Sequence, residues 1–474
     1  MKELAHSEAP APAAVQDIRL FRLTWPIFLE ILLFMLMGSV DTFMLSRVSD
    51  DAVSAVGAAN HIVSIAILVL EVIGNGAAIV LAQYIGSRQL YEAAKVTAVS
   101  IVLNGLIGAA MSLLFVLLSH AMLKMMNLQG DILAYADTYL LIVGGGILVQ
   151  ALINIMAAII RTYGFTKEVM FVAFGMNLAH VIANYALIFG HWGFPALGVM
   201  GAAISTVASK VVCLILLVWM MRRLMEVRVG WRDYWRLPMH LVRKILKIGI
   251  PSAFEQVMYQ TCQLVFVFYT TFLGATALAS KQYASNISMY IYLFSAAVGI
   301  GTSIMTGRLV GAGRPDDAYR RVWKSVLWAL SITVVVDAVI IGFRVPLMSL
   351  FTDNADIIRL GSQVIVLSIL LETGRTCNMV VINSLRASGD ATFPVYMGVL
   401  SMVCMSLPLG YLLVFQLNMG LVGVWLAIAA DEWLRAIIMF FRWRSRKWEA
   451  KRLVEPNTPQ IQPTAAAPAG NEAL

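Results

Sequence analysis

Long apolar stretches recur along this chain, and each is long enough to cross a lipid bilayer as an α-helix. About 20 apolar residues span the hydrocarbon core of a membrane. The twelve stretches cover approximately residues 24–46, 60–84, 95–119, 134–160, 168–190, 198–221, 246–273, 283–307, 322–343, 357–385, 394–415 and 421–441. A β-barrel would need alternating segments of roughly ten residues, which this chain lacks. The pattern predicts an all-α membrane protein with twelve transmembrane helices.

The low content of charged residues supports the same class. Only 13% of the 474 residues are charged and 60% are hydrophobic, whereas a soluble domain is about a quarter charged. The cysteines all lie within apolar stretches: Cys213, Cys262, Cys377 and Cys404. They predict buried free thiols, rather than a disulfide framework or a metal knuckle.

Lysine and arginine are unevenly distributed between the loops, and this asymmetry sets the orientation. With the N-terminus placed in the cytoplasm, the outside loops hold only Arg47, Lys124, Lys281 and Arg344. We therefore expect a multi-pass protein of the cell (inner) membrane with both termini cytoplasmic. The cytoplasmic loops explain the net charge of +8, so the expected surroundings are the lipid bilayer, with no nucleic acid as partner.

The two halves of the chain repeat each other with a constant offset of 225 positions. The matched pairs include Pro26 with Pro251, Glu30 with Glu255, Gly86 with Gly311, Arg161 with Arg386, and Gly164 with Gly389. Six spans per half preserve the orientation of the repeat. The repeat therefore predicts two six-helix bundles related by pseudo-twofold symmetry, an architecture of alternating-access transporters.

This repeat and the loop composition divide the chain into five segments. They are a cytoplasmic N-terminal segment 1–19, an N-terminal bundle 20–222, a cytoplasmic interfacial linker 223–245, a C-terminal bundle 246–445 and a polar tail 446–474. The tail is rich in proline and alanine, which predicts disorder. The N-terminal segment lacks the apolar region of a signal peptide.

Polar side chains inside the membrane are costly and mark candidate sites. Asn177, His180 and Asn184 have helical spacing and share one face of a predicted span. With Asp41 nearby, this face can hold Na⁺ through oxygen ligands or a proton through the histidine. Two alternatives stay open: the stripe can serve hydrogen bonding between helices, and Asp41 can reach toward water at the outer end of its span.

The second half carries a larger set of charges within predicted spans. Glu372 and Arg375 are three positions apart, and Arg435 lies three positions after Glu432 and four after Asp431. Each pair can form an ion pair along one helix. Such pairs can brace the bundle, or they can belong to a cation or substrate site.

Two further acids in this half have no partner at helical spacing. Glu255 and one acid of the last span remain after the arginines are assigned, so they can carry a proton or meet a cationic substrate. Asp337 has apolar neighbours on both sides. For Asp337 the sequence does not decide between a packing role and a functional one.

Motifs for enzymatic chemistry are absent from the sequence. It contains no Walker A motif, no GxSxG and no HExxH. We expect neither an enzyme nor a bound cofactor, apart from H⁺ or Na⁺ as a coupling ion.

Several stretches together resemble the multidrug and toxic compound extrusion (MATE) family of cation-coupled efflux transporters. They are GSVDTFMLSR, AVGAAN, NYALIFGHWGFPALGVMGAAIST, GIPSAFEQ, GRLVGAGRPDDAYR and NSLRASGD. The resemblance covers residues 20–445, and the long stretch through spans five and six is the most specific.

The resemblance implies roles for particular residues. Asp41, Asn184 and Thr206 match the cation-coupling positions of the N-lobe and form the possible Na⁺ site, and Glu255 matches a carboxylate of the C-lobe cation site. This sequence departs from the family at two places. His180 stands where asparagine is more usual, and Arg375 falls where many members keep an aspartate, with Glu372 one turn away. These departures put the C-lobe site (Glu255, Glu372, Arg375, Asp431) in doubt and favour the N-lobe.

The sequence therefore predicts a secondary active antiporter that exports cationic or amphipathic organic compounds in exchange for H⁺ or Na⁺. We expect it to work as a monomer. A flippase for a lipid-linked precursor is the alternative, and a wide cationic cavity would favour it. A membrane scaffold without transport is disfavoured by the repeat and the buried acids.

Overall fold

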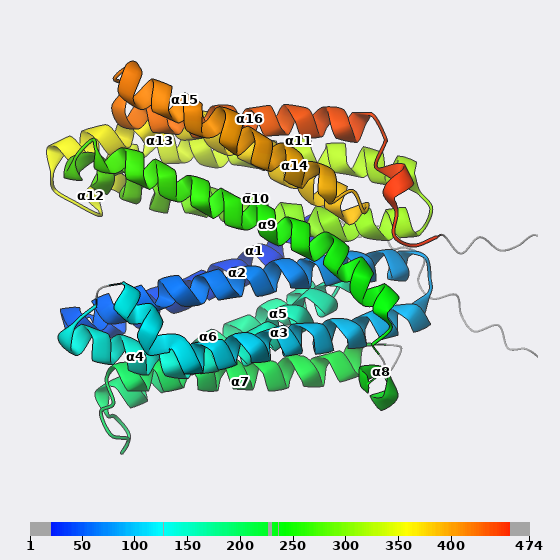
Figure 1. Cartoon of the computed structure of the whole chain (residues 1–474), viewed down its shortest axis with the longest axis horizontal. Helices are drawn as coiled ribbons and strands as arrows, with labels where there is room; N and C mark the ends of the chain where they lie inside the picture. Colours follow the sequence, from blue (N-terminus) through cyan, green and yellow to red (C-terminus); the bar gives the residue numbers. More distant parts are fainter. Residues whose placement is uncertain (1–19, 127, 226–229, 236, 456–474) are drawn as a thin grey trace, which may run out of the picture.

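The computed structural model describes residues 20–126, 128–225, 230–235 and 237–455. Throughout these ranges every regular element is a helix, and the helices form two lobes that lie side by side (Figure 1). The N-terminal lobe contains α1 to α7 and the C-terminal lobe α9 to α16, with the short helix α8 (Trp231–Trp235) in the linker. The predicted fold class, two helical bundles from the two halves of the chain, is confirmed.

The N-terminal lobe consists of α1 (Leu20–Leu45), α2 (Asp50–Gly86), α3 (Leu90–Met125), α4 (Gly130–Gly145), α5 (Ile147–Thr162), α6 (Thr166–Phe189) and α7 (Val199–Leu224). The span predicted as one helix, 134–160, is two: α4 and α5 meet at 44°. Three consecutive glycines weaken the helix at 144–146. Gly144 also has no room for a side chain, because Phe115 of α3 packs against it.

The C-terminal lobe contains α9 (Met239–Thr271), α10 (Ala275–Gly311), α11 (Pro315–Gly342), α12 (Arg344–Ser349), α13 (Ala355–Ala387) and α16 (Gly420–Arg444). Between the last two, one span is built from α14 (Thr392–Ser401), η1 (Met402–Ser406), α15 (Leu407–Tyr411) and η2 (Leu412–Gln416). The π-helical segments η1 and η2 flank Pro408. Proline removes a backbone donor, and wider turns accommodate the interruption.

The twelve spans differ in how apolar they are. Within the described ranges nine single helices are long and apolar enough to cross a membrane, and the bent pair α4–α5 makes ten. The other two are α9 and α16, with 33 and 25 residues. They are long enough to cross, but α9 buries Glu255, and α16 buries Asp431, Glu432 and Arg435. These two less apolar spans thus carry several of the candidate site residues of the C-terminal lobe.

The lobes meet most closely at the end of the molecule where α8 lies, on the right of Figure 1. There α2 and α10 cross with their backbones in contact. A side chain at Gly86 would meet the backbone of Arg308, and one at Gly311 would meet the backbone of Gln83. This crossing requires glycine in both helices, and it lies at the end that the charge asymmetry predicts to be cytoplasmic.

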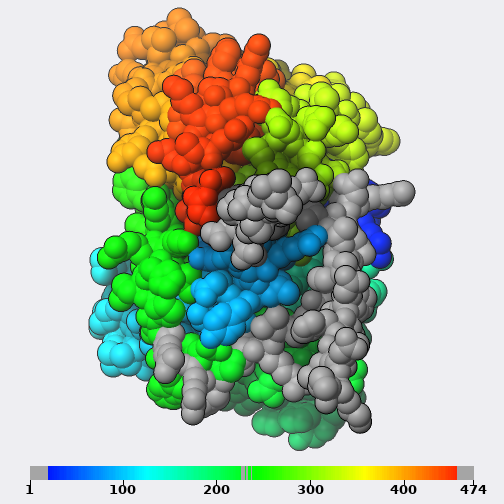
Figure 2. Space-filling view, turned by 90° about the vertical axis from the view of Figure 1, so that its right-hand side faces the viewer, coloured from blue at the N-terminus to red at the C-terminus, as the bar shows by residue number. Residues whose placement is uncertain are grey.

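Residues 446–455, the described part of the segment after α16, are folded, although the sequence predicts a disordered tail from residue 446. Trp448 is fully buried and stacks on Trp443 with ring centroids 4.2 Å apart. Val454 packs in the core of the N-terminal lobe, and the backbone N–H of Leu453 donates to Gln83 Oε1 at 2.9 Å. The segment thus crosses from one lobe to the other, red beside blue in Figure 2.

Other predicted boundaries shift or lie outside the described residues. The linker predicted at 223–245 is shorter, because α9 already begins at Met239. Two basic residues of the predicted linker, Arg243 and Lys244, belong to the first turns of this long helix. The predictions for 1–19 and for 456–474 concern residues outside the described ranges.

Candidate functional site

A buried polar cluster in the N-terminal lobe surrounds Asp41 of α1. Asn184 of α6 donates from Nδ2 to Asp41 Oδ1 at 2.6 Å, and His180 Nε2 lies 3.1 Å from the same oxygen. Thr206 Oγ1 of α7 lies 3.3 Å from His180 Nε2, and Ser205 donates to Asn184 Oδ1. These residues are at most 3% exposed. Asp41 therefore does not reach toward water, as one alternative from the sequence supposed.

The contacts of His180 indicate its protonation state. Its Nδ1 atom has no hydrogen-bond partner within the described ranges. A neutral ring with its proton on Nε2 can donate to Asp41 and leaves only a weak acceptor unpaired. A second proton on Nδ1 would place an unpaired N–H in the interior, which is costly. A ring with its proton on Nε2 therefore fits the contact with Asp41 Oδ1.

One predicted member of the cluster lies apart from it. Asn177 donates from Nδ2 to the carbonyl of Ala173 at 2.9 Å, within its own helix. Helical spacing placed Asn177 on the same stripe as His180, but the side chain is satisfied by its own backbone. The structure thus brings together Asp41, His180, Asn184 and Thr206, and leaves Asn177 outside.

Sequence reasoning missed three side chains near this cluster. Lys210 of α7 interacts electrostatically with Asp41, and so does Tyr139 of α4, whose hydroxyl donates to Asn60 Oδ1 at 3.3 Å. Lys210 could have been found, because it is a charged residue inside a predicted span. Ser205 is the neighbour of Thr206, whereas nothing in the sequence singles out Tyr139.

The C-terminal lobe holds a chain of buried charges along α13 and α16. Arg375 donates from NH1 to Glu372 Oε1 at 2.7 Å, and its Nε lies 3.6 Å from Glu432 Oε1. Arg435 NH2 lies 3.0 Å from both Glu432 Oε1 and Asp431 Oδ2. The ion pairs expected from helical spacing are present. They join Glu372, Arg375 and Asp431 of the predicted site into one network.

Glu255 does not belong to that network but to an ion pair that its repeat mate also makes. Arg386 donates from NH2 to Glu255 Oε2 at 2.6 Å, and in the other lobe Arg161 donates from NH1 to Glu30 Oε1 at 2.7 Å. Both acids and both arginines are related by the offset of 225. Each lobe therefore holds the same buried pair, formed by residues too distant in sequence for helical spacing to predict.

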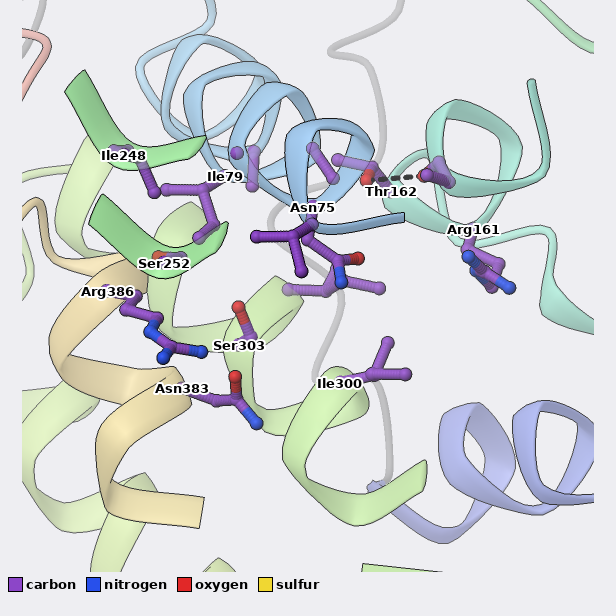
Figure 3. A pocket seen from close by; sticks show the side chains of 16 residues that line it. Asn75, Ile79, Arg161, Thr162, Ile248, Ser252, Ile300, Ser303, Asn383 and Arg386 are labelled. Carbon is purple, nitrogen blue, oxygen red and sulfur yellow. Dashed lines mark hydrogen bonds between the residues drawn. The ribbon is translucent and has the colours of Figure 1, made fainter. Parts of the chain in front are cut away.

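A pocket between the lobes is lined by both arginines of these pairs. It contains about 640 Å³ of empty space, part of it open to solvent. Figure 3 shows Arg386 and Arg161 on opposite sides, with Asn75, Ser303 and Asn383 between them. Isoleucines of α2, α9 and α10 complete the lining. The pocket offers an apolar wall and polar groups from both lobes.

One face of α2 continues this polar surface away from the pocket. Ser54, His61, Ser64, Glu71 and Asn75 recur at helical spacing, and their side chains are exposed or half-buried. Side chains that face lipid are apolar, whereas polar stripes face a water-filled cavity. We therefore assign this stripe to the space between the lobes.

Glu71 is the acid on this stripe. It lies one turn before Asn75 on α2, and it interacts electrostatically with Arg161 and Glu30 of its own lobe and with Tyr292 of the other. In the described part of the chain no hydrogen bond or ion pair engages its carboxylate. Glu71 thus presents a carboxyl group without an ion-pair partner among the described side chains to the space between the lobes.

Comparison with known proteins identifies the family. The family model MatE matches residues 26–186 and 251–412. The two matched segments begin 225 positions apart (251 − 26) and fall one in each lobe. The chain belongs to the MATE family. Its members are membrane transporters rather than enzymes, so the resemblance seen in the sequence is confirmed.

Sequence relatives match this MATE chain over most of its length, and a solved structure shares its fold. An uncharacterized transporter of Bacillus subtilis, YisQ, is 42% identical over 445 residues, covering 94% of this chain and 98% of YisQ. A probable multidrug resistance protein NorM of Thermotoga maritima is 26% identical over 449 residues, covering 93% and 95%. A crystal structure of MATE in the bent conformation superposes with a TM-score of 0.81 at 19% identity, covering 90% of this chain and 94% of that chain.

The groups around Asp41 of this MATE transporter include both oxygen and nitrogen atoms. A sodium site needs several oxygen ligands. Asp41 and Thr206 offer oxygens, but the Asn184 amide turns its Nδ2 toward Asp41 and its oxygen toward Ser205. Na⁺ binding would require this amide to rotate, whereas a proton on Asp41 requires no change of ligands.

Proposed function

We propose that this MATE transporter is a proton-coupled antiporter that exports small amphipathic organic cations. The observation that supports the coupling most is the buried carboxylate of Asp41, held by Asn184 at 2.6 Å and beside His180 at 3.1 Å. Protonation removes the charge that these donors stabilise. The contacts between α1 and α6 then weaken. The equilibrium shifts toward the transporter state that binds the proton more tightly, and the difference in proton affinity between the two states sets the size of the shift.

Helix α1 provides a physical link from the proton to the substrate space. It carries Asp41 and, eleven positions earlier (41 − 30), Glu30. This separation corresponds to about 16 Å along a helix. Glu30 pairs with Arg161, which lines the pocket between the lobes. A movement of α1 on protonation therefore changes the pocket wall directly.

The charges around the pocket favour a cationic substrate over a lipid-linked anion. Arg161 and Arg386 line the pocket, but Glu30 and Glu255 compensate them at 2.7 and 2.6 Å. Glu71 adds a negative charge without an ion-pair partner among the described side chains. The flippase alternative would require a cationic cavity, so it is the weaker proposal. The orientation that we propose places both termini and α8 in the cytoplasm.

Transport into everted membrane vesicles tests this function. Tetraphenylphosphonium, a permanent lipophilic cation, serves as the probe, with either a pH gradient or a Na⁺ gradient imposed. We expect uptake driven by the pH gradient without Na⁺. Uptake that requires Na⁺ and ignores the pH gradient would contradict proton coupling. No uptake with either gradient would contradict the cationic substrate.

A further inference from the structure

Asp337 of α11 is a fully buried carboxylate that no other group stabilises. Its exposure is 0%, and neither carboxylate oxygen has a hydrogen-bond partner within the described ranges. The hydroxyl one turn before it, Thr333 Oγ1, instead bonds Thr376 Oγ1 at 3.0 Å. Thr376 Oγ1 also lies 2.6 Å from Ser295 Oγ. The nearby hydroxyls are thus engaged with one another.

The charges around Asp337 do not compensate it either. The charged group that acts on it is Glu372 of α13, which has the same sign. Arg344 of α12, a charged residue shortly after the end of α11, donates to the carbonyl of Ile341 at 2.8 Å. The helix α10, which also packs on α11, contributes the hydroxyl of Ser295 and no charge to this contact.

The arginines of the neighbouring network are already used. Arg375 pairs with Glu372 and Glu432, and Arg435 pairs with Glu432 and Asp431. With Asp337, this region buries four acids against two arginines. An isolated carboxylate without hydrogen bonds is very costly in the interior, so a neutral acid that carries its proton is the stable form.

We propose that Asp337 is a second proton-binding site, located in the C-terminal lobe and separate from Asp41. It holds a proton in the state described here and releases it when the transport cycle admits water or a cation to this lobe. The assignment rests on the proposed antiport for its role in transport, and on burial and missing partners for the bound proton.

A series of contacts and electrostatic interactions links this site with the space between the lobes. Release of the proton adds a negative charge beside Glu372, whose partner is Arg375. The guanidinium of Arg375 lies over the ring of Tyr292 at 5.8 Å. Tyr292 in turn is within electrostatic range of Glu71. A cation held near Glu71 can therefore favour deprotonation of Asp337, which couples substrate binding to proton release.

Counting protons on substrate binding tests the role in transport. The purified full-length transporter is mixed with tetraphenylphosphonium in weak buffer, and a pH indicator reports released protons. We expect Asp337→Asn to bind the cation and release about one proton fewer than wild type, with an additive loss in Asp41→Asn/Asp337→Asn. The control Asp356→Asn changes an acid whose side chain is 75% exposed and should match wild type. Equal proton release by Asp337→Asn and wild type would overturn the proposal.

A stability measurement tests the bound proton without any substrate. Unfolding frees the carboxyl group to ionise in water. Folding of wild type therefore takes up a proton at Asp337, whereas folding of Asp337→Asn does not. We expect wild type to lose thermal stability relative to Asp337→Asn as the pH rises from about 5 to about 8. A difference that stays constant over this range would refute the protonated Asp337, even if the proposed antiport is correct. If wild type transports no cation but the difference depends on pH, only the antiport fails.

Discussion

Gln83 and Arg308 occupy equivalent positions in the two halves of the chain, and each donates a hydrogen bond to a backbone carbonyl of the opposite lobe. Gln83 Nε2 reaches Ala387 O at 2.7 Å, and Arg308 Nε reaches Thr162 O at 3.1 Å. The acceptors, like the donors, are 225 positions apart. This symmetric pair of bonds, beside the crossing of Gly86 and Gly311, closes the predicted cytoplasmic end of the molecule.

The close crossing predicts that a side chain at Gly311 prevents closure. Gly311→Ala would place Cβ against the backbone of Gln83, which cannot move aside as a flexible side chain can. We expect cation efflux to fall by about tenfold or more, because a population shift of 1.4 kcal/mol changes an equilibrium tenfold. Gly342→Ala is the control, since no atom lies within 4 Å of its Cβ position. Efflux at the wild-type rate in Gly311→Ala would show that this end need not close.

The negative charge of Glu71 predicts its effect on substrate affinity. Glu71→Gln keeps the shape of the side chain but removes the charge that faces the space between the lobes. We expect binding of tetraphenylphosphonium to weaken roughly tenfold, while a neutral amphipathic dye of similar size binds unchanged. Equilibrium binding to the purified protein measures both. An equal loss for the neutral dye would indicate a steric role instead.

The ion pair of Glu30 and Arg161 predicts that removing only the acid weakens cation binding, whereas removing both charges does not. Glu30→Gln leaves Arg161 as an uncompensated charge at the pocket, so cation binding should weaken. Glu30→Gln/Arg161→Met removes both charges and should recover most of the affinity. Binding by the single and double variants forms a double-mutant cycle. If the double variant binds as poorly as the single one, the pair supports the structure of the pocket and not its charge balance.

The position of His180 predicts the choice of coupling ion. A histidine nitrogen is a poorer ligand for a hard cation than an amide oxygen. We expect His180→Asn to export in a Na⁺ gradient as well as in a pH gradient, whereas wild type responds to the pH gradient alone. Efflux in matched gradients with and without Na⁺ measures this. An unchanged ion preference in the variant would leave His180 with a packing role.

The sequence predicted those contacts that helical spacing determines. The ion pairs of Arg375 and Arg435 follow from spacings of three and four positions, and the stripe of His180 and Asn184 follows from the same geometry. The partner of Glu255 could not be predicted, because Arg386 lies 131 positions away. The two residues meet only because α9 and α13 fold into the same lobe. The repeat singled out these residues without indicating that they touch.

The other differences between prediction and structure arise from individual local contacts that a sequence pattern does not reveal. Asn177 has the correct spacing, but its amide finds a backbone carbonyl of its own helix, a choice that spacing does not reveal. The break between α4 and α5 falls at three consecutive glycines, and Phe115 packs into the space beside the first of them, Gly144. Residues 446–455 are mostly polar in composition, and their order depends on a few apolar side chains such as Trp448 and Val454.

Transport by Asp41→Asn compared with wild type tests the central claim most directly. Both proteins are reconstituted into liposomes, and pH-driven transport of tetraphenylphosphonium is measured together with its equilibrium binding. Asparagine keeps the shape of the side chain and removes the exchangeable proton. We predict that the variant folds and binds the cation, while its pH-driven transport falls by about a hundredfold or more. Transport by Asp41→Asn at the wild-type rate, driven by the same pH gradient, would contradict proton coupling at Asp41.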